Sequence, residues 1–338
     1  MFKRILLIRR DGIGDMLNTT PAIASLRLSY PDSRIIIACS PSQAELLEGN
    51  PDVDETVILK SSLGGEVRRV RPDLAIASQN AYLCNLTALL SGARIRLGWK
   101  GKLLSSLLSI RVPYRYAKGE THEARRNLDL VAKLCDSLAP LRLKLVLTDE
   151  ERREGMREII RAGIDPERAW CGIHPGGSSW DKLWPPDGFA RIGERLSKRY
   201  GMRVAIIFGP DEEGIADEIA SQMHIKPVLI QPKSVRKLAA VIAHTPLFIC
   251  NDSGPMHIAA ALDVPTLAIF GPTDHVRWRP LSKRARVIRQ DLGCFPCSAH
   301  KCRRGYECIK KLPVELVWKE IEEMLGDEDT CAELLTHR

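Results

Sequence analysis

The chain has 338 residues, of which 44% are hydrophobic and 27% are charged, a composition typical of globular proteins and not of disordered or fibrous ones. At roughly 150 residues per domain, this length predicts two domains. The longest apolar runs have the length of a strand, well short of the ~20 residues that cross a bilayer. The first residues do not read as a signal peptide, because Arg9 and Arg10 close a run of only four apolar residues. We therefore expect a cytoplasmic protein.

The net charge of +8 is unevenly distributed. Residues 94–144 carry twelve Lys or Arg against four Asp or Glu. Such a surplus indicates a phosphate-bearing partner, which is a nucleic acid, an anionic membrane surface or a phosphorylated substrate. The alternative is a solvated basic face without a partner.

Short apolar runs alternate with helical patterns along the chain. In the first half, strands are expected at 4–9, 34–39 and 73–77, with a helix at about 20–29. In the second half, strands are expected at 169–174, 203–208, 246–250 and 265–270, and helices at 187–200, 212–223, 234–244 and 255–262. Short, fully apolar strands separated by helices are typical of parallel sheets covered on both faces.

The sequence therefore predicts an α/β protein of two doubly wound domains, residues 1–150 and 151–338, joined by a charged helical stretch near 148–168. Ligands of such sheets bind beyond the carboxyl ends of the strands, so the loops that follow strands are the candidate sites.

The first candidate loop follows the first strand and reads Arg-Arg-Asp-Gly-Ile-Gly-Asp, residues 9–15. It lacks the third glycine of the dinucleotide-binding fingerprint, which disfavours a dehydrogenase. Asp15 is either an ordinary turn residue or a carboxylate that acts as a general base. The pattern alone leaves both interpretations open.

A second candidate loop spans residues 174–185, from His-Pro-Gly-Gly to Trp-Pro. Its glycines expose backbone N–H groups, Ser178 and Ser179 add hydroxyls, and Lys182 adds a positive charge. These groups together suit a phosphate. The alternative is a solvent-exposed loop with a surface lysine.

A third candidate loop reads Asn-Asp-Ser-Gly-Pro-Met-His and opens an alanine-rich helix. Asp252 or Ser253 can cap that helix, and Gly254 lets a ligand approach the backbone, so the helix N-terminus suits an anion. His257 lies in the first turn and is either a phosphate ligand or a structural histidine. In a fourth loop, Glu212 is either an acceptor for ribose hydroxyls or an acidic residue of a first helical turn.

Together these motifs resemble glycosyltransferase family 9, the ADP-heptose:lipopolysaccharide heptosyltransferases. The resemblance rests on Gly-Ile-Gly-Asp, on His-Pro-Gly-Gly with the later Lys-Leu-Trp-Pro, and on Asn-Asp-Ser-Gly-Pro-Met-His with Phe-Gly-Pro-Thr-Asp. It covers nearly the whole chain in order. It implies a GT-B fold, in which two Rossmann-like domains face a cleft, and an inverting, metal-independent transfer of heptose from ADP-heptose to the lipopolysaccharide inner core.

The resemblance also implies roles for single residues: Asp15 as catalytic base, Lys182 as phosphate ligand, Asp252, Ser253, Gly254 and His257 at the helix N-terminus, and Glu212 at the nucleoside, with Glu213 one step away. The chain departs from the family at residues 9–11, where small or hydroxyl residues are often found. This departure bears on the acceptor more than on the donor.

The implied partners are a nucleotide-sugar donor and a phosphorylated glycolipid acceptor, with no cofactor and no nucleic acid. Within this class, another donor sugar or a later acceptor is the alternative. From other classes, a nucleotide-sugar 2-epimerase of the same fold is expected to move a ring proton with no acceptor, and a binding protein to do no chemistry. ADP release that depends on an acceptor distinguishes these possibilities.

The basic region further predicts peripheral contact with the inner face of the cytoplasmic membrane. Four leucines share one face of an expected helix within residues 99–118, flanked by aromatic and basic side chains, which is typical of a helix lying on anionic lipid. The alternative is that the leucines pack on the N-terminal sheet. The residues concerned are Leu103, Leu104, Leu107 and Leu108, with Trp99, Tyr114, Tyr116, Lys100, Lys102, Arg111, Arg115 and Lys118.

Six of the ten cysteines are scattered as core residues would be in a reducing compartment. The other four, Cys294, Cys297, Cys302 and Cys308, form a cluster that leaves a structural metal, disulfides or reduced thiols open. The pair Asp52 and Asp54 has the D-x-D spacing of a metal site, but it follows Asn-Pro and precedes a strand, so we expect a turn.

Overall fold

The computed structural model describes residues 2–60, 65–79, 81–101, 103–295, 297 and 302–326. The chain divides into two compact units, Met1–Val146 and Leu147–Arg338. Within the described part of the chain, no helix has the length and apolarity that crossing a membrane requires.

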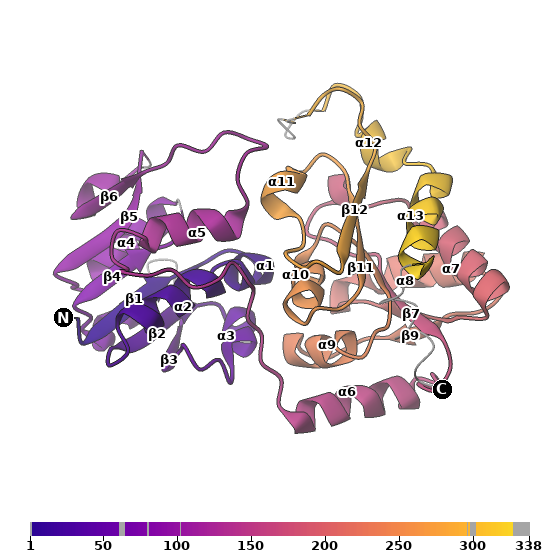
Figure 1. The fold of residues 1–338 in the computed structure, drawn as a ribbon, viewed down its shortest axis with the longest axis horizontal. Coiled ribbons are helices and arrows are strands. Elements are labelled where there is room, and N and C mark those ends of the chain that lie inside the picture. Colours follow the sequence, from indigo (N-terminus) through magenta and orange to yellow (C-terminus); the bar gives the residue numbers. More distant parts are fainter. Residues whose placement is uncertain are drawn as a thin grey trace. The chain divides into compact units, whose positions relative to one another are not determined.

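The N-terminal unit contains a six-stranded parallel sheet of order β3-β2-β1-β4-β5-β6 (Figure 1). Its strands are β1 (Arg4–Ile8), β2 (Arg34–Cys39), β3 (Glu55–Ile58), β4 (Leu74–Ala77), β5 (Ile95–Lys100) and β6 (Ile110–Pro113). Its helices are α1 (Ile13–Leu17), α2 (Thr20–Ser29), α3 (Pro41–Leu47), η1 (Gly65–Val70), α4 (Tyr82–Leu90), η2 (Ser105–Leu107) and α5 (Glu123–Val131).

The central strands of this unit are apolar at every buried position, after the exposed arginine that opens β1 and β2, because both faces of the sheet are covered. Successive side chains of a strand point to opposite faces. In β1, Ile5 and Leu7 pack in one core with α2 and α5, whereas Leu6 and Ile8 pack in a second core with η1 and α4. The predicted doubly wound arrangement is confirmed for this unit.

The C-terminal unit contains a second six-stranded parallel sheet, of order β12-β11-β10-β7-β8-β9. Its strands are β7 (Trp170–His174), β8 (Arg203–Ile207), β9 (Val228–Ile230), β10 (Phe248–Asn251), β11 (Thr266–Phe270) and β12 (Ala285–Arg289). Its helices are α6 (Asp149–Arg161), η3 (Trp180–Lys182), α7 (Pro186–Tyr200), η4 (Pro210–Glu212), α8 (Glu213–Gln222), α9 (Val235–Ile242), α10 (Gly254–Ala261), α11 (His275–Trp278), α12 (Glu307–Lys310) and α13 (Val314–Gly326).

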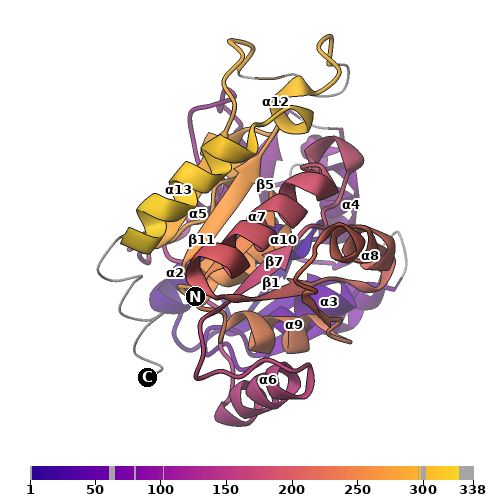
Figure 2. The same ribbon diagram turned by 90° about the vertical axis from the view of Figure 1, so that its right-hand side faces the viewer.

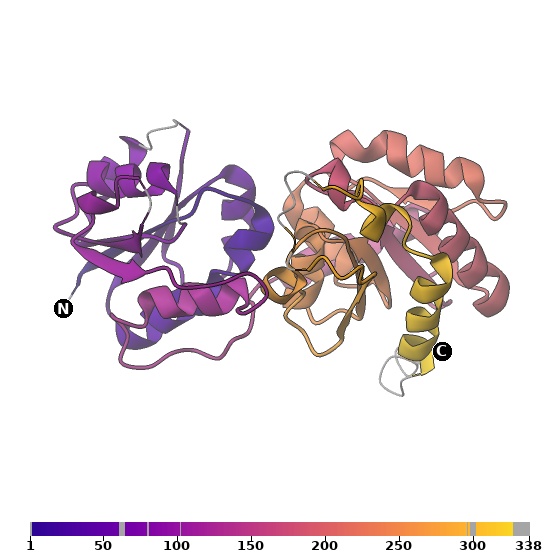
Figure 3. The same cartoon turned by 90° about the horizontal axis from the view of Figure 1, so that it is seen from above.

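Helices cover both faces of this sheet as well (Figure 3). Helices α7, α8 and α13 share one apolar core with the sheet, and Figure 2 shows α7 and α13 running across that face. Helix α6 packs on α9: Glu151 accepts hydrogen bonds from Arg236, and a Cβ on Gly155 would lie 2.5 Å from the carbonyl oxygen of Ala240. The charged stretch after residue 148 is therefore a well-anchored helix of the second unit.

Both sheets contain a topological switch point. In each, the chain adds two strands on one side of the first strand and then crosses to the other side, between β1 and β4 in the first sheet and between β7 and β10 in the second. Loops that leave neighbouring strands in opposite directions open a crevice at this point, where ligands of such sheets bind.

The predicted interfacial helix within residues 99–118 is wrong. The segment begins at the end of β5, contains the single turn η2, and continues into β6, which pairs with β5 in parallel. Leu108 is only 4% exposed and packs in the core against the sheet, so part of the leucine pattern reflects core packing.

The aromatic residues flanking the same segment are also packed. Trp99 is buried, and its ring contacts those of Tyr114 and Tyr116 edge-on at 5.3 and 5.8 Å between ring centroids. Leu103, in contrast, is 71% exposed. Lys102 lies outside the described residues.

Candidate active site

Three candidate loops of the C-terminal unit leave adjacent strands. The strands β10, β7 and β8 are neighbours in the sheet, and their carboxyl ends lead into residues 252–254, 175–182 and 208–212. The carboxyl ends of parallel strands meet at one edge, so the fold gathers the proposed donor-binding residues there. The first two loops flank the switch point.

The positive charge of this edge is held by an ion pair. The Lys182 ammonium lies 3.1 Å from Oδ2 of Asp252, and the Asp252 side chain is only 6% exposed. Ser253 precedes α10 with an extended backbone, and its buried hydroxyl finds no hydrogen-bond partner among the described residues. A buried polar group without a partner is costly, so an unpaired hydroxyl at a helix N-terminus beside a lysine suits an anionic ligand.

Glu212 lies against the glycine loop. Its carboxylate accepts a hydrogen bond from the backbone N–H of Gly209 at 2.7 Å. A Cβ on Gly176 would lie 1.7 Å from Oε1 of Glu212, so any larger residue there would displace the Glu212 carboxylate. The imidazole Nε2 of His174 is 3.8 Å from the same oxygen. Glu212, which is predicted to bind the ribose, therefore lies in direct contact with the predicted phosphate-binding loop at Gly176.

The glycine loop is held in place by a residue that the sequence motifs did not indicate. Asn251, the last residue of β10, donates to the carbonyl oxygen of Pro175 at 2.6 Å and accepts from the backbone N–H of Trp184 at 3.1 Å. One side chain thus fixes both ends of the loop. An asparagine at the end of an apolar strand is the signal that could have revealed it.

The remaining predicted residues of this unit differ in exposure. His257 is 4% exposed on α10, with its ring 6.5 Å from that of Trp278. Ser178 is exposed, whereas Ser179 is half-buried and its hydroxyl donates to the carboxylate of Asp181. Ser178 therefore offers the more accessible hydroxyl in this loop.

In the N-terminal unit, Asp15 lies on α1, directly after the loop that leaves β1 at the switch point. Its Oδ2 accepts from the backbone N–H of Gly12 at 3.2 Å, and its Oδ1 accepts from Nη2 of Arg9 at 2.8 Å. Asp11 accepts from Nε of the same arginine at 2.6 Å. The two carboxylates are 22% and 20% exposed, so both reach solvent beside a buried guanidinium.

Electrostatics distinguish the members of this cluster. Burial disfavours the charged form of Arg9, but the carboxylates of Asp11, Asp15 and Glu123 outweigh it and raise the pKa of the guanidinium. Burial raises the pKa of Asp11 to about 6, against the attraction of Arg9 and with the help of the Asp15 charge. Asp11 is therefore an unusually basic aspartate and a rival to Asp15.

The clustered cysteines all line one small pocket with Gly271 and Arg289. They are free thiols, and Cys302 accepts a hydrogen bond from the backbone N–H of Tyr306 at 3.3 Å. Burial and the neighbouring thiols raise the pKa of Cys308 to about 11. Within the described ranges, no group of three or more His, Cys, Asp or Glu is arranged to hold a metal ion.

The scattered cysteines and the D-x-D pair match their structural interpretations. Cys39, Cys84, Cys171 and Cys250 are buried and Cys135 is half-buried, while Cys331 lies outside the described residues. Asp52 pairs with Lys144, and Asp54 accepts from Arg27 at 2.5 Å and from the backbone N–H of Ile35 at 2.6 Å. The turn before β3 is confirmed.

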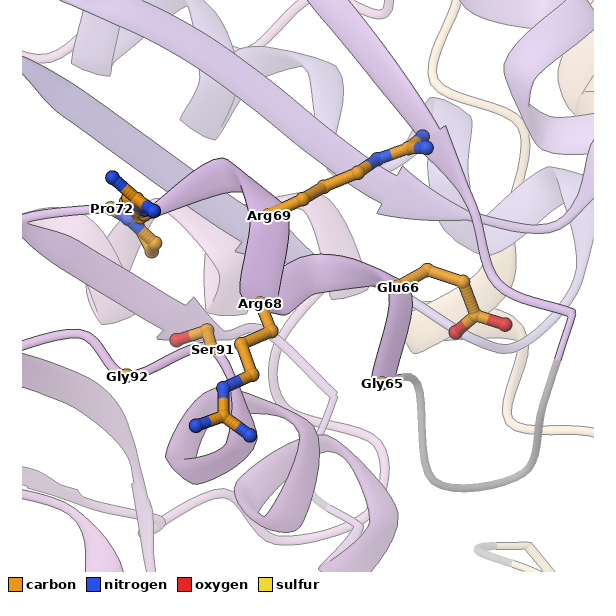
Figure 4. Close-up of a pocket in the computed structure, with 8 residues that line it drawn as sticks. Gly65, Glu66, Arg68, Arg69, Pro72, Ser91 and Gly92 are labelled. Carbon is orange, nitrogen blue, oxygen red and sulfur yellow. The ribbon is translucent and has the colours of Figure 1, made fainter.

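A basic cavity lies elsewhere in the N-terminal unit. It has a volume of about 790 Å³, and its lining includes three arginines and one acidic residue: Arg68, Arg69, Arg71 and Glu66, with Ser91 and Gly92. Figure 4 shows Arg68 and Arg69 extending in different directions. These residues precede β4 and β5, so the cavity lies at the amino ends of the strands, whereas Asp15 follows the carboxyl end of β1.

Comparison with known proteins agrees with this fold. The family model for glycosyltransferase family 9 (heptosyltransferase) matches residues 61–307. Lipooligosaccharide heptosyltransferase 2 of Campylobacter jejuni serotype O:6 is 33% identical over 321 residues, covering 92% of this chain and 96% of the relative. Lipopolysaccharide heptosyltransferase 3 of Escherichia coli K12 is 28% identical over 340 residues, covering 95% and 97%. The solved structure of E. coli ADP-heptose lps heptosyltransferase II matches with a TM-score of 0.78 at 24% identity, covering 96% and 99%.

The chain therefore belongs to glycosyltransferase family 9. It is a glycosyltransferase with the GT-B fold that the sequence motifs implied, built from two parallel α/β sheets.

Proposed function

We propose that the protein is an inverting heptosyltransferase that moves heptose from ADP-heptose onto the inner core of lipopolysaccharide. The observation that carries this proposal is the anion-binding edge of the C-terminal unit, where Lys182, the unpaired Ser253 hydroxyl and the N-terminus of α10 converge. The names of the relatives support heptose as the sugar and lipopolysaccharide as the acceptor.

Each site residue then has a distinct task. The pyrophosphate binds Lys182, the backbone at Ser253–Gly254 with Asp252 and His257 beside it, and the hydroxyls of Ser178 and Ser179. Glu212 accepts hydrogen bonds from the ribose. Asp15 takes the proton of the acceptor hydroxyl as its oxygen attacks the anomeric carbon on the face opposite the departing ADP, which inverts the configuration.

The decisive experiment measures ADP release from ADP-heptose with and without heptose-deficient lipopolysaccharide. A transferase releases ADP in proportion to acceptor, whereas a 2-epimerase converts the sugar nucleotide with no acceptor present. We expect acceptor-dependent release of ADP that is unchanged in EDTA. Lys182 and the N-terminus of α10 neutralise the charge on the pyrophosphate of the departing ADP, so no metal ion is needed for this. Acceptor-independent turnover would contradict the proposal, and a loss in EDTA restored by Mg²⁺ would contradict metal independence.

We further propose that the enzyme acts on the cytoplasmic side of the membrane, in peripheral contact with anionic lipid. The support is the basic cavity with its exposed arginines Arg68, Arg69 and Arg71. Each arginine close to an anionic bilayer contributes about 1 kcal/mol to the free energy of membrane binding. We assign the membrane contact to these arginines because the interfacial helix expected within residues 99–118 does not form.

Vesicle co-sedimentation tests this contact. Anionic vesicles at low salt should retain the protein and neutral vesicles should not, and the double variant Arg68→Glu with Arg69→Glu should lose retention about tenfold or more. Arg168→Glu, an 84% exposed position of the other unit, is the matched control. Equal retention on both vesicle types, or a double variant that binds normally, would remove the electrostatic argument.

A further inference from the structure

A buried arginine connects the two candidate carboxylates of the N-terminal unit to a distant helix. Arg9 is 2% exposed and uses three of its N–H donors on carboxylates: Nε on Asp11 at 2.6 Å, and Nη2 on Asp15 at 2.8 Å and on Glu123 at 3.3 Å. Its Nη1 donates to Oδ1 of Asn127 at 3.1 Å. Four partners therefore surround one planar guanidinium.

The two sides of the guanidinium have different neighbours. Nε and one N–H of Nη2 form a fork that normally grips a single carboxylate with both oxygens. Here the fork is divided, because one prong holds Asp11 and the other holds Asp15. The rest of the guanidinium is held by Glu123 and Asn127 of α5. Arg9 thus connects the two candidate carboxylates to helix α5.

The residues that hold Arg9 and helix α1 are themselves fixed by further hydrogen bonds. Asn127 accepts from Arg9 through Oδ1 and donates through Nδ2 to the carbonyl oxygen of Asn18 at 3.0 Å, at the end of α1. From another direction, Gln43 donates to the carbonyl oxygens of Asp11 and Gly12 at 2.7 and 3.0 Å. Both ends of α1, the helix that carries Asp15, are therefore held by side chains from other elements.

We propose that Arg9 is a positioning residue of the transfer reaction, which fixes the Asp15 carboxylate toward the acceptor while Asn127 fixes Arg9. This inference rests on the proposed role of Asp15. A cation at this place has a second consequence, since three carboxylates share the cluster and would repel one another without it. Lysine cannot replace arginine here, because its ammonium has three donors and no planar fork for four separated partners.

The test is a double-mutant cycle between Arg9 and Asp15. Arg9→Lys keeps the charge and should lower kcat by about a hundredfold, the cost of a misplaced reacting group, with ADP affinity unchanged. In an Asp15→Asn background the same change should cost less than about threefold, because Arg9 acts through Asp15. ADP release from ADP-heptose with heptose-deficient lipopolysaccharide is the readout.

Two further variants separate positioning from stability. Asn127→Ala leaves the Asp15 hydrogen bond to Arg9 in place and should give a smaller loss of kcat that also vanishes in the Asp15→Asn background. Arg27→Lys is the matched control, since Arg27 has 19% side-chain exposure and binds Asp54 and two carbonyl oxygens. It should lower the melting temperature and leave kcat unchanged.

The outcomes distinguish this inference from the proposed function. Arg9→Lys with normal kcat, or equal losses in both backgrounds, would overturn the positioning role alone. Full activity of Asp15→Asn by itself would instead overturn the role of Asp15 as the base.

Discussion

Replacement of Asp15 by asparagine should lower kcat by about 10²–10⁴-fold, the typical cost of losing a positioned general base. The side chain keeps its shape, and its amide oxygen can still accept from Nη2 of Arg9, which lies 2.8 Å from the native carboxylate. The variant should therefore fold normally and bind ADP normally while transferring slowly. Steady-state ADP release gives the rate, and calorimetric titration gives the ADP affinity.

The variant Asp11→Asn can contradict the assignment of Asp15 as the base. Its carboxyl is bound to the same arginine, and burial raises its pKa to about 6, which makes it a stronger base than an ordinary aspartate. We expect Asp11→Asn to keep more than a tenth of the wild-type rate, as should Asp32→Asn, an exposed control in the same unit. If Asp11→Asn were the slow variant and Asp15→Asn the active one, the two roles would be exchanged.

The central strands are predictable because their sequence pattern has one physical cause. A strand buried on both faces must be apolar wherever it is buried. The expected strand at 34–39 coincides with β2, which is apolar and buried at every residue after Arg34. Edge strands lack this pattern. The edge strand β6 carries Arg111, and its neighbour β5 carries Arg96 and Lys100. The leucines between these two strands are spaced as in a helix, so a local pattern predicted the wrong element.

The candidate site is predictable to the same extent. Lys182, Asp252 and Glu212 follow strands that become neighbours in the sheet, so knowing the class of fold was sufficient to expect them at one edge. Arg9 could not be found in this way. A charged residue after a strand is normally solvated, and its burial depends on Asn127, 118 residues further along the chain.

Removal of Lys182 should weaken ADP binding by about 1.5–3 kcal/mol, the usual value of a hydrogen bond to a charged group. This corresponds to a loss of affinity of roughly tenfold to 150-fold. In the free protein the ammonium pairs with Asp252, whose side chain is nearly buried, so a pyrophosphate has to share a lysine that is already oriented. Lys182→Ala removes the cation and leaves that carboxylate facing the ligand, and both changes act against ADP.

Adenosine is the ligand that makes this experiment specific. It lacks the phosphates, so its affinity should be the same for Lys182→Ala and wild type if the lysine binds the pyrophosphate and the nucleoside site is intact. Lys198→Ala is the matched control, because Lys198 forms a 2.9 Å ion pair with Glu194 on α7 and should leave both affinities unchanged. Unchanged ADP affinity in Lys182→Ala would contradict the assignment. Equal losses for ADP and adenosine would show that the loop had collapsed, in which case Lys182 would support the site through Asp252 and not through the phosphates.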